Sequence, residues 1–398
     1  MVQVKPFVID NWVRQFKHLA STTFHDTCVQ PLSLQELSQF QASDSSLSPI
    51  NNLNPLSYGA VLGNPSLREK ILSLYSKDSV EPIDKLSLTV TQGAISANFL
   101  VLDTLLGPGD HVICQYPTYQ QLYEVPRRAG TDVSLWRTNE EKKWIPNTDD
   151  LSSLVKENTK MIIINNPNNP TGASIPLAVL EEIISFAAQR NIIVFSDEVF
   201  RPLFHDQFAE NPPSIMYFAD VYKNIIATSS LSKAYSLPGI RVGWVITPNP
   251  DLLNPVILAR DYASLSVSQV DQDIATYALD KSVRSKILQR SLAICKRNID
   301  ALERFITLHA DRLRWIKPSG ASSAFVQVID PRAGGPVDDK LFCERIIQES
   351  GLLIIPGGLA FGTEGELDFK GYMRVGFVCS AEKFEQALVI WGQCLGQL

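Results

Sequence analysis

The 398-residue sequence lacks a long apolar run, a block of like charges and any closely spaced pair of cysteines. Its longest apolar runs, such as 161–164 and 352–355, are far too short to span a bilayer. The opening MVQVKPFVIDNWVRQFK has neither the apolar core nor the small-residue cleavage site of a secretory signal. These absences argue against a membrane span and against secretion, and we expect a cytoplasmic protein.

The metal-binding and nucleic-acid-binding classes are disfavoured in the same way. The six cysteines are scattered with no CxxC spacing, which predicts reduced thiols rather than a disulfide framework or a zinc site. The five histidines are isolated and are interpreted as structural. A formal net charge of −6 argues against a nucleic-acid surface. We therefore predict no metal, no nucleic-acid partner and no membrane partner.

What the sequence does contain is enough apolar material, 45% of residues, for a sizeable core. Its length favours one large domain plus a smaller one. We predict a large domain over residues 48–290 and a small domain formed by residues 1–47 together with 291–398. The segment 44–55, rich in Ser, Asn and Pro, is predicted to be a loop near the boundary.

The middle of the chain alternates short β-branched runs with amphipathic helical periods, which indicates an α/β fold with a mostly parallel sheet between helices. Ligands bind such sheets at the carboxyl ends of the strands. After a long predicted helix over 282–310, the pattern changes to that of a smaller α+β unit. The predicted strands are 86–91, 111–115, 161–165, 192–196, 225–229, 242–247, 325–329, 352–355 and 373–378; the other predicted helices are 94–106, 177–190, 340–349 and 381–395.

Lys233 lies in a Ser-rich turn after the apolar run 225–228 and is followed by Arg241. Partial burial and cationic surroundings would lower the pKa of such a lysine, as a Schiff-base lysine requires. The hydroxyls and Arg241 suit a phosphate monoester. Taken alone, the pattern also fits a solvated surface lysine.

Two further polar segments follow apolar runs. The segment 165–172, NNPNNPTG, is rich in turn formers. Asp197 closes the predicted strand 192–196, where a buried acid needs a partner. That partner could be a metal, a helix cap or a cationic heterocycle, although no histidine or second acid stands at metal-ligand spacing.

Taken together, Asn169, Asp197, Lys233 and Arg241 resemble the signature of the aspartate-aminotransferase superfamily, pyridoxal-phosphate (PLP) enzymes of fold type I. The segments NNPNNPTG, SDEVFRPL and SSLSKAYSLPGIRVGW match in content, order and spacing. The likeness extends from about Asn54 to the C-terminus. It implies a mostly parallel, seven-stranded-type sheet, PLP as cofactor and action on an amino acid.

The resemblance implies a role for each of these residues. Lys233 would hold PLP as a Schiff base and later move a proton, and Asp197 would pair with the pyridine nitrogen. Asn169 would donate a hydrogen bond to the ring oxygen O3′ and contribute to the substrate site. Ser230 and Arg241 would hold the phosphate.

Other assignments also follow from the resemblance. Gly93, Ala94 and Ile95 would form a phosphate loop at a helix N-terminus, and Tyr119 would stack on the cofactor ring. Tyr58 would reach the phosphate from a neighbouring subunit, so a homodimer with shared active sites is implied. A structural role remains open for Tyr119. Arg374 would clamp the substrate's α-carboxylate bidentately, and a surface position is the alternative.

The sequence departs from the family at two places. Phe200 stands near the cofactor where the family usually has a tyrosine, so one hydrogen bond to O3′ is missing, and we predict a raised pKa of the lysine–cofactor linkage. The opening, with Trp12 predicted to be packed, loosely resembles capreomycidine-synthase-like enzymes. No obvious second arginine is placed to bind a side-chain carboxylate, so a dicarboxylate substrate is not favoured.

The function predicted from these features is that of an aminotransferase acting on the α-amino group of a free L-amino acid. The alternative is PLP-dependent elimination, replacement, cyclisation or oxidation on the same scaffold. A PLP-sensing transcription regulator is disfavoured, because about 50 residues precede the family core and the net charge is negative. The motifs do not identify the amino acid or the acceptor.

Overall fold

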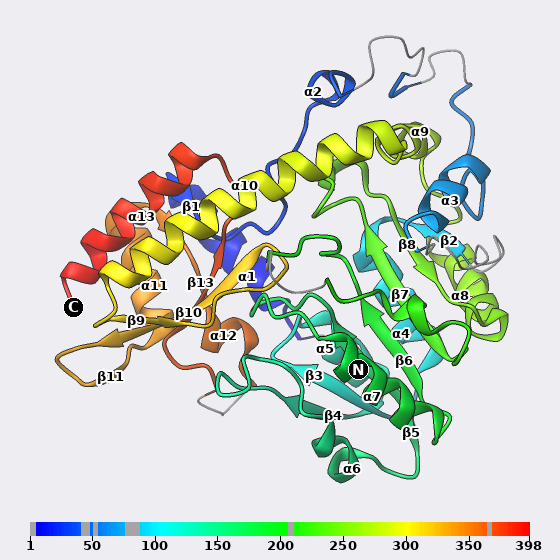
Figure 1. Ribbon diagram of the computed structural model, residues 1–398, viewed down its shortest axis with the longest axis horizontal. Helices are drawn as coiled ribbons and strands as arrows, with labels where there is room; N and C mark the ends of the chain where they lie inside the picture. The colour runs from blue at the N-terminus through cyan, green and yellow to red at the C-terminus, as the bar shows by residue number, and fades with distance from the viewer. Residues whose placement is uncertain (1–4, 41–47, 51–54, 76–87, 206–210, 364–367) are drawn as a thin grey trace.

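A seven-stranded sheet forms the centre of the computed structural model, which describes residues 5–40, 48–50, 55–75, 88–205, 211–363 and 368–398 (Figure 1). The strand order is β2-β8-β7-β6-β5-β3-β4, and β8 alone is antiparallel to its neighbours. The predicted mostly parallel sheet is therefore confirmed. The strands are β2 (Leu88–Thr91), β3 (His111–Tyr116), β4 (Asp132–Arg137), β5 (Thr159–Asn165), β6 (Ile193–Asp197), β7 (Ile225–Ser230) and β8 (Gly243–Ile246).

Both faces of this sheet are buried, because alternate residues of each strand point to opposite sides. Val112 and Ile163 pack with apolar side chains of α4 (Gly93–Leu105), α5 (Gln121–Arg128) and α8 (Pro250–Ala263). Ile113 and Ile162 belong to the opposite cluster, together with residues of α7 (Leu177–Ala188). The near-continuous apolar character of the strands follows from this two-sided burial.

Strand β4 is an element that the sequence patterns did not predict. It lies at the edge of the sheet, and of its six residues only Trp136 is buried. A strand with one buried side chain shows little alternation of apolar and polar residues, so the sequence gives only a weak indication of a strand there. Residues 86 and 87 of the first predicted strand lie outside the described residues.

A second, antiparallel sheet follows the long helix α10 (Lys281–Leu308). Its order is β11-β10-β14-β13, with β9 also paired to β10. This unit confirms the predicted smaller α+β region. The boundaries at 47/48 and 290/291 stay predictions, and residue 290 lies inside α10. The elements are β9 (Leu313–Trp315), β10 (Ser323–Asp330), β11 (Gly335–Pro336), α11 (Asp339–Ser350), β13 (Ile355–Pro356), α12 (Gly357–Phe361), β14 (Tyr372–Gly376) and α13 (Ala381–Gly396).

The run 352–355, expected to be one strand, divides between two sheets. Strand β12 (Leu352–Leu353) pairs in parallel with β1 (Thr22–Thr23), whereas β13 pairs with β14. Between them, the carbonyl of Ile354 accepts a hydrogen bond of 3.0 Å from the indole of Trp12. Trp12 is buried, as predicted.

The N-terminal segment, residues 5–40, contacts both the unit built on the seven-stranded sheet and the unit built on the antiparallel sheet (Figure 1). Its helices are α1 (Val8–Phe16) and α2 (Leu34–Ser38). Phe24 packs against Phe384 and Trp391 of α13, and the N–H of Leu32 donates to the carbonyl of Ser236 at 3.0 Å. The remaining short elements are α3 (Pro65–Leu72), α6 (Leu151–Leu154), α9 (Gln269–Ala278) and 3-10 turns at Lys17–Leu19, Thr148–Asp150, Ile215–Phe218 and Pro238–Ile240.

Among the described residues, no helix is both long and apolar enough to cross a membrane. In the same part of the chain, no three His, Cys, Asp or Glu side chains form a group suited to a metal ion. All six cysteines are free thiols.

Candidate active site

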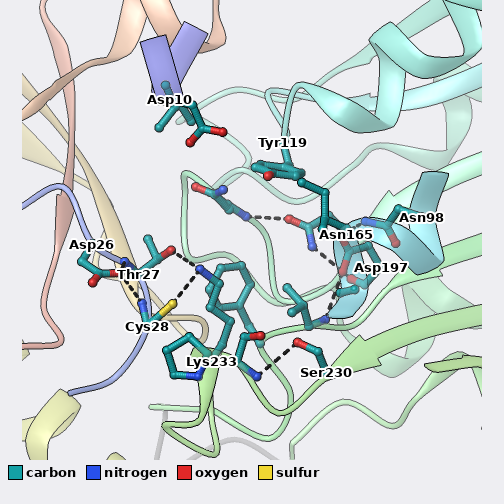
Figure 2. Close-up of a pocket in the computed structure, with 18 of the residues that line it drawn as sticks. Asp10, Asp26, Thr27, Cys28, Asn98, Tyr119, Asn165, Asp197, Ser230 and Lys233 are labelled. Carbon is teal, nitrogen blue, oxygen red and sulfur yellow. Dashed lines mark hydrogen bonds between the residues drawn. The ribbon is translucent and has the colours of Figure 1, made fainter. Parts of the chain in front are cut away.

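A cavity of about 400 Å³ lies at the carboxyl ends of β5, β6 and β7 and is covered by the N-terminal segment (Figure 2). Its volume falls within the range of small-molecule sites. Ten of the twelve residues that the sequence singled out line the cavity, and Gly93 lies next to Arg241 just behind its wall. Those that line it directly are Ala94, Ile95, Tyr119, Asn169, Asp197, Phe200, Ser230, Lys233, Arg241 and Arg374.

Asp197 is placed at the floor of the cavity by the register of the parallel strands. It is the last residue of β6 and lies beside Asn165 of β5 and Thr228 of β7. Its carboxylate accepts a 2.9 Å hydrogen bond from Asn98 Nδ2 and one of 3.1 Å from the backbone N–H of Val199. Burial raises the pKa of Asp197 to about 6, although these hydrogen bonds act in the opposite direction. A cationic partner would offset the cost of keeping this buried group charged.

Asn98, on α4, is a site residue that the sequence analysis missed. The hydroxyl of Thr228 donates to Asn98 Oδ1 at 2.5 Å, so the amide nitrogen is the atom that faces Asp197. Asn98 is 1% exposed. A polar residue on the buried face of the helix predicted over 94–106 was the signal that could have found it.

Lys233 follows β7 and extends toward the N-terminal segment (Figure 2). Its Nζ donates a hydrogen bond of 2.7 Å to Thr27 Oγ1 and lies 3.3 Å from Cys28 Sγ. The same nitrogen is 5.8 Å from the centre of the Phe200 ring. Burial raises the pKa of the Cys28 thiol, although the charge of Lys233 acts against that rise. The lysine amine is therefore inside the cavity and not on the solvated surface.

One wall of the cavity presents donors suited to an anion. Gly93 opens α4 with a φ of +78°, and a Cβ there would lie 2.4 Å from Arg241 Nη2, so only glycine permits this approach. Arg241 Nη1 donates to the carbonyl of Pro238 at 2.8 Å. Ser230 Oγ accepts the N–H of Ser232 at 3.2 Å, which leaves its own proton available. The free N–H groups of a helix N-terminus add to this positive surface.

Arg374, on β14, points into the cavity from the smaller sheet. Its Nη1 lies 3.4 Å from Asn169 Oδ1, and its Nη2 donates to the carbonyl of His25 at 2.5 Å. Its Nε has no hydrogen-bond partner among the described residues. Arg374 is 4% exposed, and burial lowers its pKa to about 10. A buried guanidinium with an unpaired donor suits an incoming carboxylate.

Three aromatic side chains line the cavity: Phe7, Tyr119 and Phe200. Tyr119 follows β3, and its ring centre lies 5.1 Å from that of Phe7 in the N-terminal segment. Burial raises the pKa of Tyr119. Phe200 packs with Ala94 and Val199, and it is 2% exposed. Tyr119 and Phe200 therefore both line the cavity, and their positions relative to the cofactor stay predictions.

The N-terminal segment contributes a second set of side chains, which the sequence analysis did not identify as functional. Asp10, on α1, and the run from Asp26 to Cys28 line the side of the cavity away from Asp197 (Figure 2). The run passes over Gly376, where a Cβ would lie 1.7 Å from the carbonyl oxygen of Asp26. The Ser322 hydroxyl donates to the carbonyl of Thr27 at 2.7 Å. The close backbone approach thus explains the glycine of the Tyr-Met-Arg-Val-Gly motif.

Asp26 has its carboxylate fixed by the same run. Its Oδ1 accepts the backbone N–H of Thr27 at 2.7 Å and that of Cys28 at 2.8 Å. Burial alone would raise its pKa, but these hydrogen bonds and the charge of Lys233 outweigh burial, so the pKa lies below its ordinary value. Asp26 is therefore ionised at neutral pH.

Tyr58 lies outside the cavity of its own chain. Its side chain is 84% exposed. Two other large side chains are also exposed: Leu56, close by in the sequence, at 89%, and Tyr262, on α8, at 97%. The prediction that Tyr58 serves a neighbouring subunit stays a prediction.

With this geometry in place, comparison with known proteins identifies the family. The model of the family "Aminotransferase class I and II" matches residues 54–389. The chain belongs to this family. A crystal structure of a PLP-dependent aminotransferase from Streptococcus suis is 33% identical, with a TM-score of 0.87, over 99% of this chain and 98% of that one.

Two curated relatives differ in how much of the chain they match. Capreomycidine synthase from Streptomyces vinaceus is 27% identical over 390 residues, 98% of this chain and 93% of the relative. Aspartate aminotransferase from Pyrococcus abyssi is 29% identical over 334 residues, 83% of this chain and 82% of the relative. The predicted family and fold are confirmed.

Membership of this family implies PLP as the cofactor, and the residues present fit it. The cavity offers an amine on Lys233, a buried acid suited to a pyridinium and an anion-binding wall in which Gly93 admits Arg241. These are the groups that a phosphorylated, cationic heterocyclic aldehyde requires. The chain is a PLP-dependent enzyme of the aminotransferase family.

Proposed function

We propose that this enzyme is an aminotransferase, which moves the α-amino group of a free L-amino acid to a 2-oxo acid. The observation that carries the proposal is the meeting of Lys233, Asp197 and Arg374 in one cavity. The amine of Lys233 suits the aldehyde of PLP, and the buried acid Asp197 suits its ring nitrogen. The buried guanidinium of Arg374 suits the substrate carboxylate. PLP, when bound, supplies an electron sink for the bonds at Cα.

Each residue of the cofactor side takes a role that its position supports. Lys233 would hold the cofactor covalently, and Asp197, oriented by Asn98, would face the ring nitrogen. Ser230 and Arg241, with the N-terminus of α4 at Gly93–Ala94–Ile95, would bind the phosphate. Tyr119 would stack on the ring, and Phe200 would lie near O3′ without donating to it.

On the substrate side, Arg374 binds the α-carboxylate with help from Asn169, which lies 3.4 Å away and also serves O3′. Lys233 then moves a proton between Cα and the cofactor carbon. Its contact with Thr27 Oγ1 at 2.7 Å gives the released amine a fixed resting position. A base held within hydrogen-bond reach of its proton is what such a step requires.

We also propose that the enzyme is a homodimer whose sites are shared. Leu56, Tyr58 and Tyr262 expose 84% or more of their surface, and large exposed apolar side chains are frequent at protein–protein interfaces. Tyr58 would then donate to the phosphate held by the partner. Equilibrium sedimentation of the Tyr58→Phe variant separates the dimer itself from this one contact.

A second candidate is PLP-dependent elimination, replacement, cyclisation or oxidation. The observation that favours it is the likeness to capreomycidine synthase, which extends over 98% of the chain, whereas the family model begins at residue 54. The residues ahead of 54 include Asp10 and the run from Asp26 to Cys28, which line the cavity.

The purified enzyme with PLP, mixed with L-amino acids in the absence of any 2-oxo acid, distinguishes the two candidates. An aminotransferase releases one 2-oxo acid per site and stops, because its cofactor has taken the amino group. The second class instead accumulates product over many turnovers while the original absorbance returns. Product masses identify the reaction in that case, and the aminotransferase proposal would then be wrong.

A further inference from the structure

We propose that the substrate's side chain ends in a cation, and that Asp10 and Asp26 bind it. This inference rests on the proposed function, because it assigns the substrate of the same cavity. It concerns two carboxylates that no part of the cofactor chemistry uses. Both belong to the N-terminal segment, ahead of the region that the family model matches.

The charges of the cavity lead to this assignment. Its lining contains three cationic side chains: Lys233 would form the Schiff base with the aldehyde, Arg241 would bind the phosphate and Arg374 would bind the α-carboxylate. Asp197 is matched by the ring nitrogen. His25 does not add a charge, because burial lowers its pKa. Asp10 and Asp26 are therefore two negative charges that neither PLP nor the α-amino and α-carboxylate groups of the substrate match.

Both carboxylates lie within electrostatic range of the substrate. Asp26 and Asp10 each act to raise the pKa of Arg374, against the larger effect of burial. An amino acid with its α-carboxylate on Arg374 would therefore have its side chain close to these two groups. Figure 2 shows Asp10 above the cavity, beside Tyr119, and Asp26 across the cavity from Asp197.

The buried guanidinium of Arg374 is an independent sign that a ligand is received here. Arg374 is 4% exposed, lines the cavity and retains an Nε with no hydrogen-bond partner among the described residues. A buried donor left unpaired is costly unless a ligand satisfies it. The carboxylates thus flank a prepared binding point for an amino acid.

The two acids also retain free acceptors. Asp26 uses Oδ1 for both backbone N–H groups, and its Oδ2 lies outside these two contacts. Asp10 makes neither a hydrogen bond nor an ion pair within the described part of the chain, and it lies in the first turn of α1. Two open carboxylates suit a planar guanidinium or an ammonium group.

The same arrangement disfavours an acidic side chain. A second carboxylate on the substrate would meet Asp10 and Asp26, and like charges at short range repel. Among the described residues that line the cavity, only Arg241 and Arg374 are arginines, and both are already assigned. The substrate preference is therefore opposite to that named for the aspartate aminotransferase relative.

Matched pairs of amino acids test the charge alone. L-arginine and L-citrulline differ in charge at nearly equal size, as do L-lysine and L-norleucine. Dissociation constants for the PLP-bound enzyme are measured from the change in cofactor absorbance. We expect the cationic member of each pair to bind about 10- to 100-fold more tightly, the range of a hydrogen bond to a charged group.

Two isosteric variants locate the effect. Asp10→Asn and Asp26→Asn should each reduce the arginine-to-citrulline ratio about tenfold, and Asp220→Asn, an exposed acid outside the cavity, should leave that ratio as it is. The ratio is the readout because the charge of Asp26 also acts on Lys233, so that any effect through Lys233 changes the affinity for both amino acids alike and leaves their ratio as it is. A general loss of affinity would not change the ratio.

Three results decide the matter. A ratio near one in the native enzyme, with neutral amino acids reacting, overturns the cationic site and leaves the proposed function standing. A high ratio that neither variant lowers overturns the assignment to Asp10 and Asp26. If no amino acid changes the absorbance at all, the proposed function fails, and this inference fails with it.

Discussion

The two sides of the cavity differ in where they come from in the chain. The cofactor side is built from strand ends and the turns that follow them, and all its residues fall within 54–389. The substrate side is built largely from α1 and the run from Asp26 to Cys28, which precede that region. The cofactor chemistry thus belongs to the sheet shared by the family, while we assign substrate choice to a segment that lies ahead of the region matched by the family model.

The largest expected effect is on the cofactor side, at Lys233. Lys233→Ala should abolish covalent attachment and slow proton transfer about 10²- to 10⁴-fold, because the general base is lost. Borohydride reduction followed by peptide mass analysis measures attachment, and single-turnover kinetics measure the rate. Attachment that persisted in the variant would show that another lysine holds the cofactor.

Asp197 allows a test that needs no turnover. Burial raises its pKa from 3.8 to about 6, so the folded cofactor-free protein binds the proton more tightly than the unfolded chain. The stability gained from that proton is complete below pH 3.8 and is lost as pH rises through about 6. Cofactor-free Asp197→Asn should therefore become more stable than the native protein above that pH, by roughly 3 kcal/mol at most.

The measurement is the unfolding free energy of both cofactor-free proteins between pH 4 and 8. The difference should grow with pH and level off near neutrality. With PLP bound, the native protein should have the higher free energy of unfolding of the two, because the cationic ring nitrogen offsets the buried charge of Asp197. A difference independent of pH would show that Asp197 keeps its charge without the cofactor.

A smaller effect is expected where the cofactor side departs from its family. Phe200→Tyr should restore a hydrogen bond to O3′ and lower the pKa of the lysine–cofactor linkage by about one to two units. The measurement is a pH titration of the cofactor absorbance in both proteins. An unchanged pKa would mean that the phenol does not reach O3′.

The smallest expected effect is on substrate affinity, when the hydrogen bonds that attach the N-terminal segment to the rest of the protein are removed. Gln120 accepts the N–H of Val8 at 2.8 Å and donates to the carbonyl of Pro6 at 3.0 Å, which ties the N-terminal segment to α5. Gln120→Ala should cost about 1 kcal/mol of this attachment and raise KM about fivefold. The affinity for PLP should stay that of the native enzyme.

Exposed Gln189, which bonds only within its own helix, provides the matched control as Gln189→Ala. Equal losses of substrate and cofactor affinity in Gln120→Ala would show that the two sides are not separable.

The cofactor side was predictable because its residues follow the strongest patterns in the chain. Asp197 and Lys233 come directly after fully buried strands, and parallel strands bring such positions to one edge. Asn98 escaped because its role depends on the packing of α4 against β6 and β7, and its polar side chain on the buried face of the predicted helix was its one local sign.

The substrate side was not predictable for a related physical reason. Asp10 and Asp26 lie 16 positions apart in a segment without strand–helix alternation, and they line one cavity in a fold where β1 pairs with β12 and the chain passes over Gly376. The splitting of the run 352–355 between two sheets, which creates that pairing, was also not anticipated.

The division between the cofactor side and the substrate side is tested most directly in two variants. In each, the affinity for PLP and the arginine-to-citrulline ratio are measured. Arg241→Gln should weaken PLP binding about 10- to 100-fold and leave the arginine-to-citrulline ratio close to that of the native enzyme. Asp26→Asn should reduce that ratio and leave PLP affinity nearly intact. This crossed pattern is what the account predicts. If Asp26→Asn instead loses PLP as severely as Arg241→Gln, the N-terminal segment belongs to the cofactor site and the account is contradicted.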